Sequence, residues 1–165
     1  MVNAVAGAAR AWAVLDGVPD PEIPVLSVRD LGIVRDVIER DDGGVEVVLT
    51  PTYSGCPATE VIADSVRAAL AAAGFGPVTV TQRLAPAWTT DWISAEGLRK
   101  LHAYGIAPPG ASAAQASIRL HPRGVACPRC GSADTERLSA FGATACKALY
   151  RCRACREPFE HFKPL

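Results

Sequence analysis

The chain has 165 residues with 17 basic and 17 acidic side chains, and 49% of its residues are apolar. This composition is typical of a folded protein with one medium-sized core and a small second module, and it excludes a disordered chain. Residues 1–15 hold a single charged side chain and no apolar run of spanning length, so we expect neither a membrane helix nor a secretory signal. These features predict a cytoplasmic protein.

The zero net charge conceals an uneven distribution along the chain. Residues 1–118 hold 8 basic and 13 acidic groups, which gives −5, and residues 119–165 hold 9 basic and 4 acidic groups, which gives +5. Two modules with different tasks explain this asymmetry. We predict a domain over residues 1–107, a linker without an apolar period over 108–118, and a cysteine-rich domain over 119–165.

In the first domain, the spacing of apolar residues predicts a helix, a β-hairpin, a second helix, a third strand and a short third helix, in that order. The Asp-Asp-Gly-Gly turn at 41–44 favours the hairpin, Pro57 suits the start of the second helix, and Ser94 is a suitable N-cap for the third. The expected ranges are a helix to Leu15, strands at 31–38 and 45–50, a helix at 57–73, a strand at 78–84 and a helix at 94–104. The predicted fold class is α+β, a small sheet with packed helices followed by a C-terminal zinc-ribbon-like β module.

Two Cys-x2-Cys pairs, Cys127 with Cys130 and Cys152 with Cys155, are separated by 21 residues. Two tight turns at this spacing can bring four thiolates to the corners of a tetrahedron, which is the geometry that Zn²⁺ prefers. Gly131 follows the first pair, at a position where such a turn needs a positive φ. We therefore predict a structural zinc site. Iron, alone or as a [2Fe–2S] cluster, remains an alternative because four thiolates also suit iron, while a reducing cytoplasm argues against disulfides.

Two further side chains of this domain could compete for the metal. Cys146 is a fifth cysteine of this domain, and we expect a small buried thiol on the ribbon, with an extra metal ligand as the alternative. His161, on a short terminal strand, is expected to be solvated. The surplus arginines of residues 119–165 favour an acidic protein partner over nucleic acid, because the first domain is acidic and no recognition helix follows the cysteines.

Cys56 stands alone in the first domain, in the segment that joins the predicted hairpin to the second helix. Its sulfur would lie at the helix N-terminus, where unpaired backbone amides and the helix dipole favour the thiolate, the form that binds metals. An inert cysteine in a helix-cap region is the alternative. Asp20 and Glu22 could supply oxygen ligands nearby, although residue chemistry alone favours a turn at Asp20 and a solvated glutamate.

Several motifs resemble those of known families. Residues 20–26 (DPEIPVL), 30–34 (DLGIV) and 50–57 (TPTYSGCP) resemble the signature of the small iron–sulfur assembly domain shared with SufT-type factors. Residues 86–92 (PAWTTDW) and 141–152 (FGATACKALYRC) resemble the PaaD-type component of the phenylacetyl-CoA epoxidase system. The similarity covers nearly the whole chain.

The resemblance implies an accessory role rather than an enzyme. In that system a di-iron oxygenase component and a reductase with flavin and a [2Fe–2S] cluster carry out the chemistry, and the PaaD-type component helps to mature one of them. Carried over by motif, Cys56 would be the transient ligand of iron or of an Fe–S cluster, with Asp20, Glu22 and Thr52 as its neighbours. The two Cys-x2-Cys pairs would hold the structural metal.

We therefore expect a maturation factor for the phenylacetyl-CoA oxygenase of aerobic phenylacetate degradation, with the oxygenase or reductase component as partner and neither nucleic acid nor membrane. The alternative is a structural subunit that bridges oxygenase components through its acidic and basic halves without metal transfer. A thiol enzyme with Cys56 as nucleophile is a weaker hypothesis, because no histidine lies near Cys56 in the chain. The client, the form of the iron and the formation of a homodimer are left open by the sequence.

Overall fold

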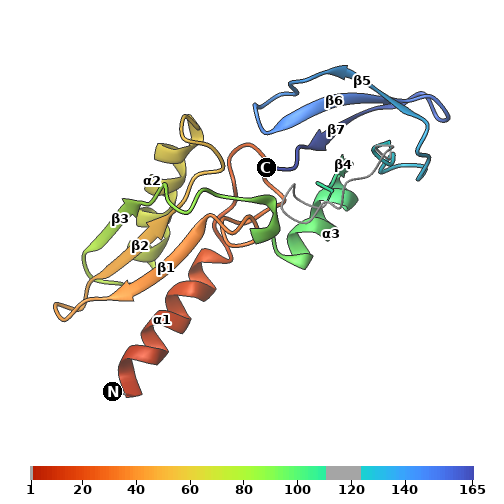
Figure 1. The fold of residues 1–165 in the computed structure, drawn as a ribbon. Helices are drawn as coiled ribbons and strands as arrows, with labels where there is room; N and C mark the ends of the chain where they lie inside the picture. The colour runs from red at the N-terminus through yellow and green to blue at the C-terminus, as the bar shows by residue number, and fades with distance from the viewer. Residues whose placement is uncertain (1, 111–123) are drawn as a thin grey trace. The chain divides into compact units, whose positions relative to one another are not determined.

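The computed structural model describes residues 2–110 and 124–165, with side chains from Gly7 onwards (Figure 1). The chain divides into two compact units, which comprise Met1–Trp88 with Trp92–Gly97, and Thr89–Asp91 with Leu98–Leu165. The first unit combines helices and a sheet and the second contains a β ribbon, so the predicted α+β class is confirmed. Within the described residues, no helix is long and apolar enough to cross a membrane.

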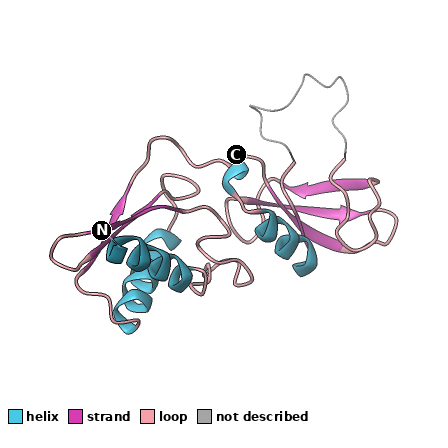
Figure 2. Ribbon diagram, turned by 90° about the horizontal axis from the view of Figure 1, so that it is seen from below, coloured by secondary structure: helices cyan, strands magenta, loops and turns pink. Residues whose placement is uncertain are grey.

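The first unit contains two helices and a three-stranded sheet. Its elements are α1 (Val2–Leu15), β1 (Val34–Glu39), β2 (Val45–Leu49), α2 (Ala58–Ala72) and β3 (Val78–Gln82). The strand order is β1-β2-β3, in which β1 and β2 form the predicted antiparallel hairpin, and α2 connects β2 to its parallel neighbour β3. Because α1 contacts β1, α2 contacts β3 and the two helices contact each other, both helices lie on one side of the sheet (Figure 2).

The core of this unit lies between the helices and the sheet. α2 buries Ile62, Val66 and Leu70, which are spaced as an amphipathic helix requires. On the central strand β2, Leu49 is fully buried. Each fully buried side chain of this kind contributes roughly 1.5–3 kcal/mol. This packing fixes the point where the chain leaves β2 and enters the loop that carries Cys56.

The second unit contains a four-stranded sheet and most of a short helix. Its elements are α3 (Ala95–Tyr104), whose first turn belongs to the first unit, β4 (Ile106–Ala107), β5 (Thr135–Ser139), β6 (Lys147–Cys152) and β7 (Pro158–Phe162). The strand order is β4-β7-β6-β5, and β5, β6 and β7 form an antiparallel ribbon. The Gly97 N–H donates a hydrogen bond to Ser94 Oγ at 2.9 Å, so the predicted N-cap of α3 is confirmed.

The division between the units differs from the expected boundary at residue 107. β4 pairs in parallel with β7, with Ile106 opposite Glu160 and Ala107 opposite His161, so residues 98–107 belong to the second unit. The physical reason is that the ribbon core is small, and buried Ala107 completes it beside two cysteines and a phenylalanine. The expected linker begins after β4, but its residues 111–118 lie outside the described part of the chain.

Candidate functional site

The four cysteines of the two pairs meet at one end of the ribbon. Their Sγ atoms all lie within 4.8 Å of one another, with 3.8 Å between Cys127 and Cys155 and 3.5 Å between Cys130 and Cys152. In a Zn(Cys)₄ site with Zn–S bonds of about 2.3 Å, neighbouring sulfurs are about 3.8 Å apart. The four side chains therefore fit one tetrahedral metal ion, and we refer to them as the cysteine cage.

Two similar turns build the cage, and we call them the first knuckle (residues 127–132) and the second knuckle (residues 152–157). In the first, the Cys127 N–H donates to Ser132 O at 2.9 Å, and in the second the Cys152 N–H donates to Glu157 O at 3.0 Å. The hydrogen bond spans five residues in both turns. Because β5 starts opposite the end of β6, with Thr135 facing Cys152, the two knuckles lie at the same end of the ribbon.

Each knuckle contains one residue in the left-handed backbone region directly after its second cysteine. Gly131 has a φ of 75°, as the sequence predicted, and Arg156 has a φ of 65° at the matching position. Of the two, only glycine adopts this conformation without a steric penalty. The second knuckle is therefore strained where the first is not.

The electrostatics of the cage favour a bound cation. The Cys155 N–H donates to Cys152 Sγ at 3.5 Å, and this hydrogen bond is the main cause that lowers the pKa of Cys152 to about 7. The Glu157 N–H acts to lower the pKa of Cys155, but burial and the neighbouring thiols outweigh it and raise that pKa to about 12. Four crowded thiols cannot all ionise without a compensating positive charge, which a divalent metal supplies.

The arginines around the cage are partly neutralised within the ribbon. Arg151 and Arg153 both donate to the Glu136 carboxylate, the latter at 3.1 Å, and these hydrogen bonds hold the pKa of Glu136 below its usual value. Arg153 also lies 3.7 Å from Asp134. The side chain of Arg156 is exposed and lines a hollow beside Cys152. The positive patch expected from the sequence is therefore smaller than the count of arginines indicates.

Cys146 lies outside the cage. It precedes β6 directly, whereas Cys152 ends that strand, so the length of the strand separates the two thiols. Cys146 is buried, and its Sγ lies 3.0 Å from Thr144 Oγ1. These contacts are those of the packed thiol that the sequence favoured over an extra ligand.

The expectation that His161 is solvated was wrong. It is buried, and its ring meets the Tyr150 ring edge-on with 5.5 Å between the centroids. Burial lowers the pKa of the imidazole. No local pattern indicated this, because β7 is covered through its register with β4 and β6.

Cys56 lies in the loop between β2 and α2, and its side chain is half-exposed. The Cys56 N–H donates to Tyr53 O at 3.2 Å, and Thr59 Oγ1 donates to Cys56 O at 2.8 Å. The backbone of Cys56 is therefore fixed on both sides, while its thiol forms no disulfide bond and the residue is only half-buried. Pro57 is the N-cap residue of α2, and the helix begins at Ala58, one residue later than expected.

The predicted neighbours of Cys56 occupy two loops of the first unit. Asp20 is buried, and its Oδ1 accepts hydrogen bonds from the Glu22 and Ile23 N–H groups at 2.9 and 2.7 Å, which is the turn that residue chemistry favoured. Glu22 is half-buried in this turn. Thr52 is half-buried in the same loop as Cys56. Their roles toward a metal cargo remain predictions.

A cavity of about 180 Å³ that was not predicted from the sequence lies beside this loop. Hydroxyl-bearing residues contribute half of its lining, which comprises Thr50, Pro51, Thr52, Tyr53, Ser54, Leu84, Ala87 and Trp88. Thr50 Oγ1 is buried and has no hydrogen-bond partner. Because the segments after β2 and β3 form the lining, the cavity lies at the carboxyl ends of two parallel strands, where α/β sheets commonly bind ligands. The run of hydroxyl-bearing residues before Cys56 was the sequence feature that could have indicated this cavity.

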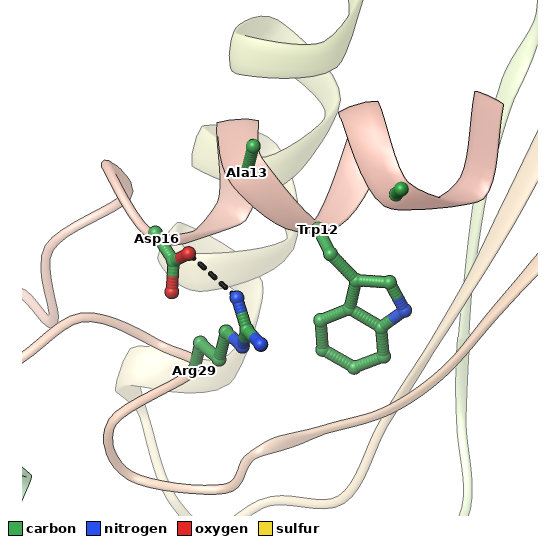
Figure 3. A pocket seen from close by; sticks show the side chains of 5 residues that line it. Trp12, Ala13, Asp16 and Arg29 are labelled. Carbon is green, nitrogen blue, oxygen red and sulfur yellow. Dashed lines mark hydrogen bonds and ion pairs between the residues drawn. The ribbon is translucent and has the colours of Figure 1, made fainter. Parts of the chain in front are cut away.

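A shallow hollow of about 420 Å³ along α1 has a different character (Figure 3). Its lining includes Trp12, together with an ion pair between Arg29 Nη1 and Asp16 Oδ2 at 2.6 Å. The Arg29 guanidinium also lies 5.4 Å from the centroid of the Trp12 ring. Its lining contains no thiol or histidine.

Two family models match the chain. The model described as "PaaD zinc beta ribbon domain" matches residues 111–163, and the model described as "Iron-sulfur cluster assembly protein" matches residues 8–81. The first match contains the cysteine cage, and the second contains Cys56. The two candidate sites therefore fall in two different family matches.

Three individual proteins are similar to the whole chain or to its first part. The chain is 52% identical over 152 residues to PaaD of Escherichia coli (strain K12), a putative component of 1,2-phenylacetyl-CoA epoxidase, and the match covers 92% of this chain and 90% of that protein. It is 37% identical over 83 residues to an Fe-S protein maturation auxiliary factor of Porphyromonas gingivalis (strain ATCC BAA-308 / W83), across 50% of this chain and 78% of that protein. A solved domain of unknown function, DUF59, from Bacillus anthracis shares the fold, with a TM-score of 0.57 and 24% identity over 61% of this chain and 95% of that one.

Proposed function

The chain belongs to the PaaD family of putative 1,2-phenylacetyl-CoA epoxidase components, and from this membership we propose that it is an accessory factor that matures an iron-containing component of that oxygenase system. The observation that carries the proposal is the contrast between two kinds of thiol. Cys56 is single and half-exposed on a fixed loop, whereas the four cage sulfurs converge on one point. The oxygenase and reductase components are the proposed partners.

The single thiol suits a transient cargo. One thiolate leaves most coordination positions of an iron ion or cluster open to other ligands, so the cargo can pass to a client. Asp20 would contribute by holding the turn at residues 20–23, and Glu22 and Thr52 are the proposed polar neighbours of the cargo. The proposed cargo is iron or an Fe–S cluster, since a single thiolate can bind both.

The cage suits a resident metal. A site closed by four protein ligands leaves no open position for substrate, which is typical of structural zinc. We propose zinc there, with iron as the alternative, held by the four cage cysteines. Its task is to close a ribbon whose own core is too small to fold alone.

We propose that the functional division follows the linker, with cargo handling in residues 1–107, the linker at 108–118 and metal-dependent folding in residues 119–165, whose ribbon is completed by β4. The chain would not turn over substrate by itself, because the compact unit that carries Cys56 contains no histidine to act as a general base. A turnover assay on the purified chain tests this directly. Product formed by the chain alone would favour the thiol-enzyme hypothesis instead.

Co-expression with the oxygenase and reductase components tests the proposal. Cys56→Ser should leave the unfolding midpoint unchanged and lower both the iron content and the activity of the client several-fold. Val61→Ser, at a 52% exposed position on α2, is the matched control and should change neither. Full client activity with Cys56→Ser would contradict the proposed role of the thiol.

A bridging subunit is the second candidate, and the observation that favours it is the opposite charge of residues 1–118 and 119–165. It predicts a stable complex with oxygenase components that dissociates as salt rises, and indifference to Cys56→Ser. The same co-expression separates the two proposals, because only the maturation role lowers the iron content of the client.

A further inference from the structure

The loop between β5 and β6 presents an aromatic side chain that the ribbon core does not use. Phe141 is 63% exposed, the largest fraction among the exposed large apolar side chains of the described residues, and Leu138, three residues earlier, is 50% exposed. Single exposed apolar side chains are common on protein surfaces. The informative feature is how the end of β5 and the loop that follows it hold Leu138 and Phe141.

A β-bulge directs Leu138 outward. Arg137 pairs with Tyr150 and Ser139 pairs with Leu149, so Leu138 is an extra residue without a partner across the ladder. Bulges of this kind re-aim a side chain and disrupt the edge of a sheet as a template for strand addition. A partner at this edge would therefore contact side chains instead of extending the sheet.

A partly buried ion pair holds the loop in one conformation. Lys147 Nζ lies 2.7 Å from Glu160 Oε2, and the Lys147 side chain is only 4% exposed. The other carboxylate oxygen, Glu160 Oε1, accepts a hydrogen bond from the Ala143 N–H at 2.8 Å, and the Gly142 N–H donates to Lys147 O at 2.7 Å. A Cβ on Gly142 would lie 2.5 Å from Glu160 Oε1, so the contacts of the Glu160 carboxylate with this loop require glycine at position 142. Phe141 is thus presented by a loop that is already ordered.

The surroundings of the phenyl ring are cationic. Lys163 Nζ lies 4.6 Å from the centroid of the Phe141 ring and donates to Ala140 O at 3.3 Å. Arg137 is exposed on β5, and residues 119–165 together carry a charge of +5. An apolar knob with a positive rim is complementary to an apolar socket flanked by carboxylates.

We propose that Phe141 and Leu138 form a docking knob that inserts into an apolar, acid-flanked socket on the client protein. Aromatic side chains at the centre of an interface commonly carry much of its binding free energy, and an ordered loop avoids the entropy loss of fixing it on binding. The identity of the client as a component of the oxygenase system rests on the function proposed above. The knob itself is a feature of the second unit and does not involve Cys56.

Binding of the full chain to the purified oxygenase and reductase components, each immobilised separately, tests the knob. Phe141→Ser should weaken binding to one component by roughly tenfold or more. Val61→Ser is the matched control, because Val61 is 52% exposed on α2, and it should change the affinity less than about twofold. Lys163→Gln should weaken the salt dependence of association. Both serine variants should unfold at the wild-type midpoint.

Several results would overturn the proposal. They are equal affinity of Phe141→Ser and wild type, equal losses in Phe141→Ser and Val61→Ser, and capture of neither component by the wild type. Self-association that Phe141→Ser abolishes would assign the knob to a homodimer and also overturn it. If Phe141→Ser does not fold, Leu138→Ser answers the same question.

Cys56→Ser measured in parallel separates this proposal from the maturation role. Tight binding by Cys56→Ser without activation of the client supports both. Tight binding with full activation contradicts the maturation role and leaves the docking knob in place.

Discussion

Replacement of Arg156 by glycine should stabilise the second knuckle. Arg156 has a φ of 65°, at the position that Gly131 occupies in the first knuckle with 75°. The left-handed conformation costs a non-glycine residue roughly 1–2 kcal/mol. The larger entropy of glycine in the unfolded chain offsets roughly 0.4–1 kcal/mol of this. The expected net gain in the free energy of unfolding is therefore about 0.5–1 kcal/mol.

Two control variants isolate the backbone effect. Arg156→Ala removes the guanidinium but keeps the strained φ, so it should leave the free energy of unfolding nearly unchanged. Gly131→Ala makes the reverse change: no atom lies within 4 Å of the added Cβ, so the expected loss of about 0.5–1 kcal/mol comes from the backbone alone.

Urea unfolding of the zinc-loaded protein measures these differences. Because folding of the ribbon and metal binding are coupled, each 1 kcal/mol should also appear as about a fivefold change in zinc affinity in a competition assay with a chelator. Equal stabilisation by Arg156→Gly and Arg156→Ala would refute the argument, since it would place the effect in the side chain. A Gly131→Ala variant as stable as wild type would refute it as well.

Three further predictions concern the second unit. Removal of the metal with a strong chelator should unfold residues 135–162 and leave the first unit folded, which amide NMR spectra will show as loss of dispersion confined to the ribbon. Lys147→Met should lower the free energy of unfolding by about 2 kcal/mol, which is less than for a fully buried ion pair because Glu160 is 25% exposed. In a double-mutant cycle, the addition of Glu160→Gln to Lys147→Met should restore most of this loss. Burial keeps the pKa of His161 in the folded protein below its value in the unfolded chain. The stability that neutral, buried His161 provides is therefore fully present above about pH 6.5 and is lost as the pH falls through the folded pKa. The free energy of unfolding of His161→Phe should depend less on pH in that range.

Local signals in the sequence predicted most elements of the first unit. The apolar period of α2, the turn residues of the hairpin and the hydroxyl of Ser94 each act over a few residues, so they can be read without tertiary information. The same holds for Gly131, whose positive φ follows from the geometry of a Cys-x2-Cys turn. The convergence of the cage sulfurs was likewise expected from spacing alone.

Features that depend on long-range pairing could not be predicted in this way. β4 has two residues and is followed by two prolines, so it carries no periodic signal, and its existence depends on the edge of β7. The burial of His161 follows from that pairing. The sequence predicted Thr50 as the end of a strand. The structure shows that its hydroxyl is buried without a hydrogen-bond partner, beside the cavity formed by the segments after β2 and β3.

The pairing of β4 with β7 determines how the ribbon can be separated from the rest of the chain. A fragment that begins at residue 119 would lack Ile106 and Ala107, and the outer backbone groups of β7 would be left open to pairing with other molecules. It would also lack the small side chain that completes the hydrophobic cluster around Cys127 and Cys152. A fragment that contains the cysteine cage therefore has to start upstream of residue 106 to be stable and free of aggregation.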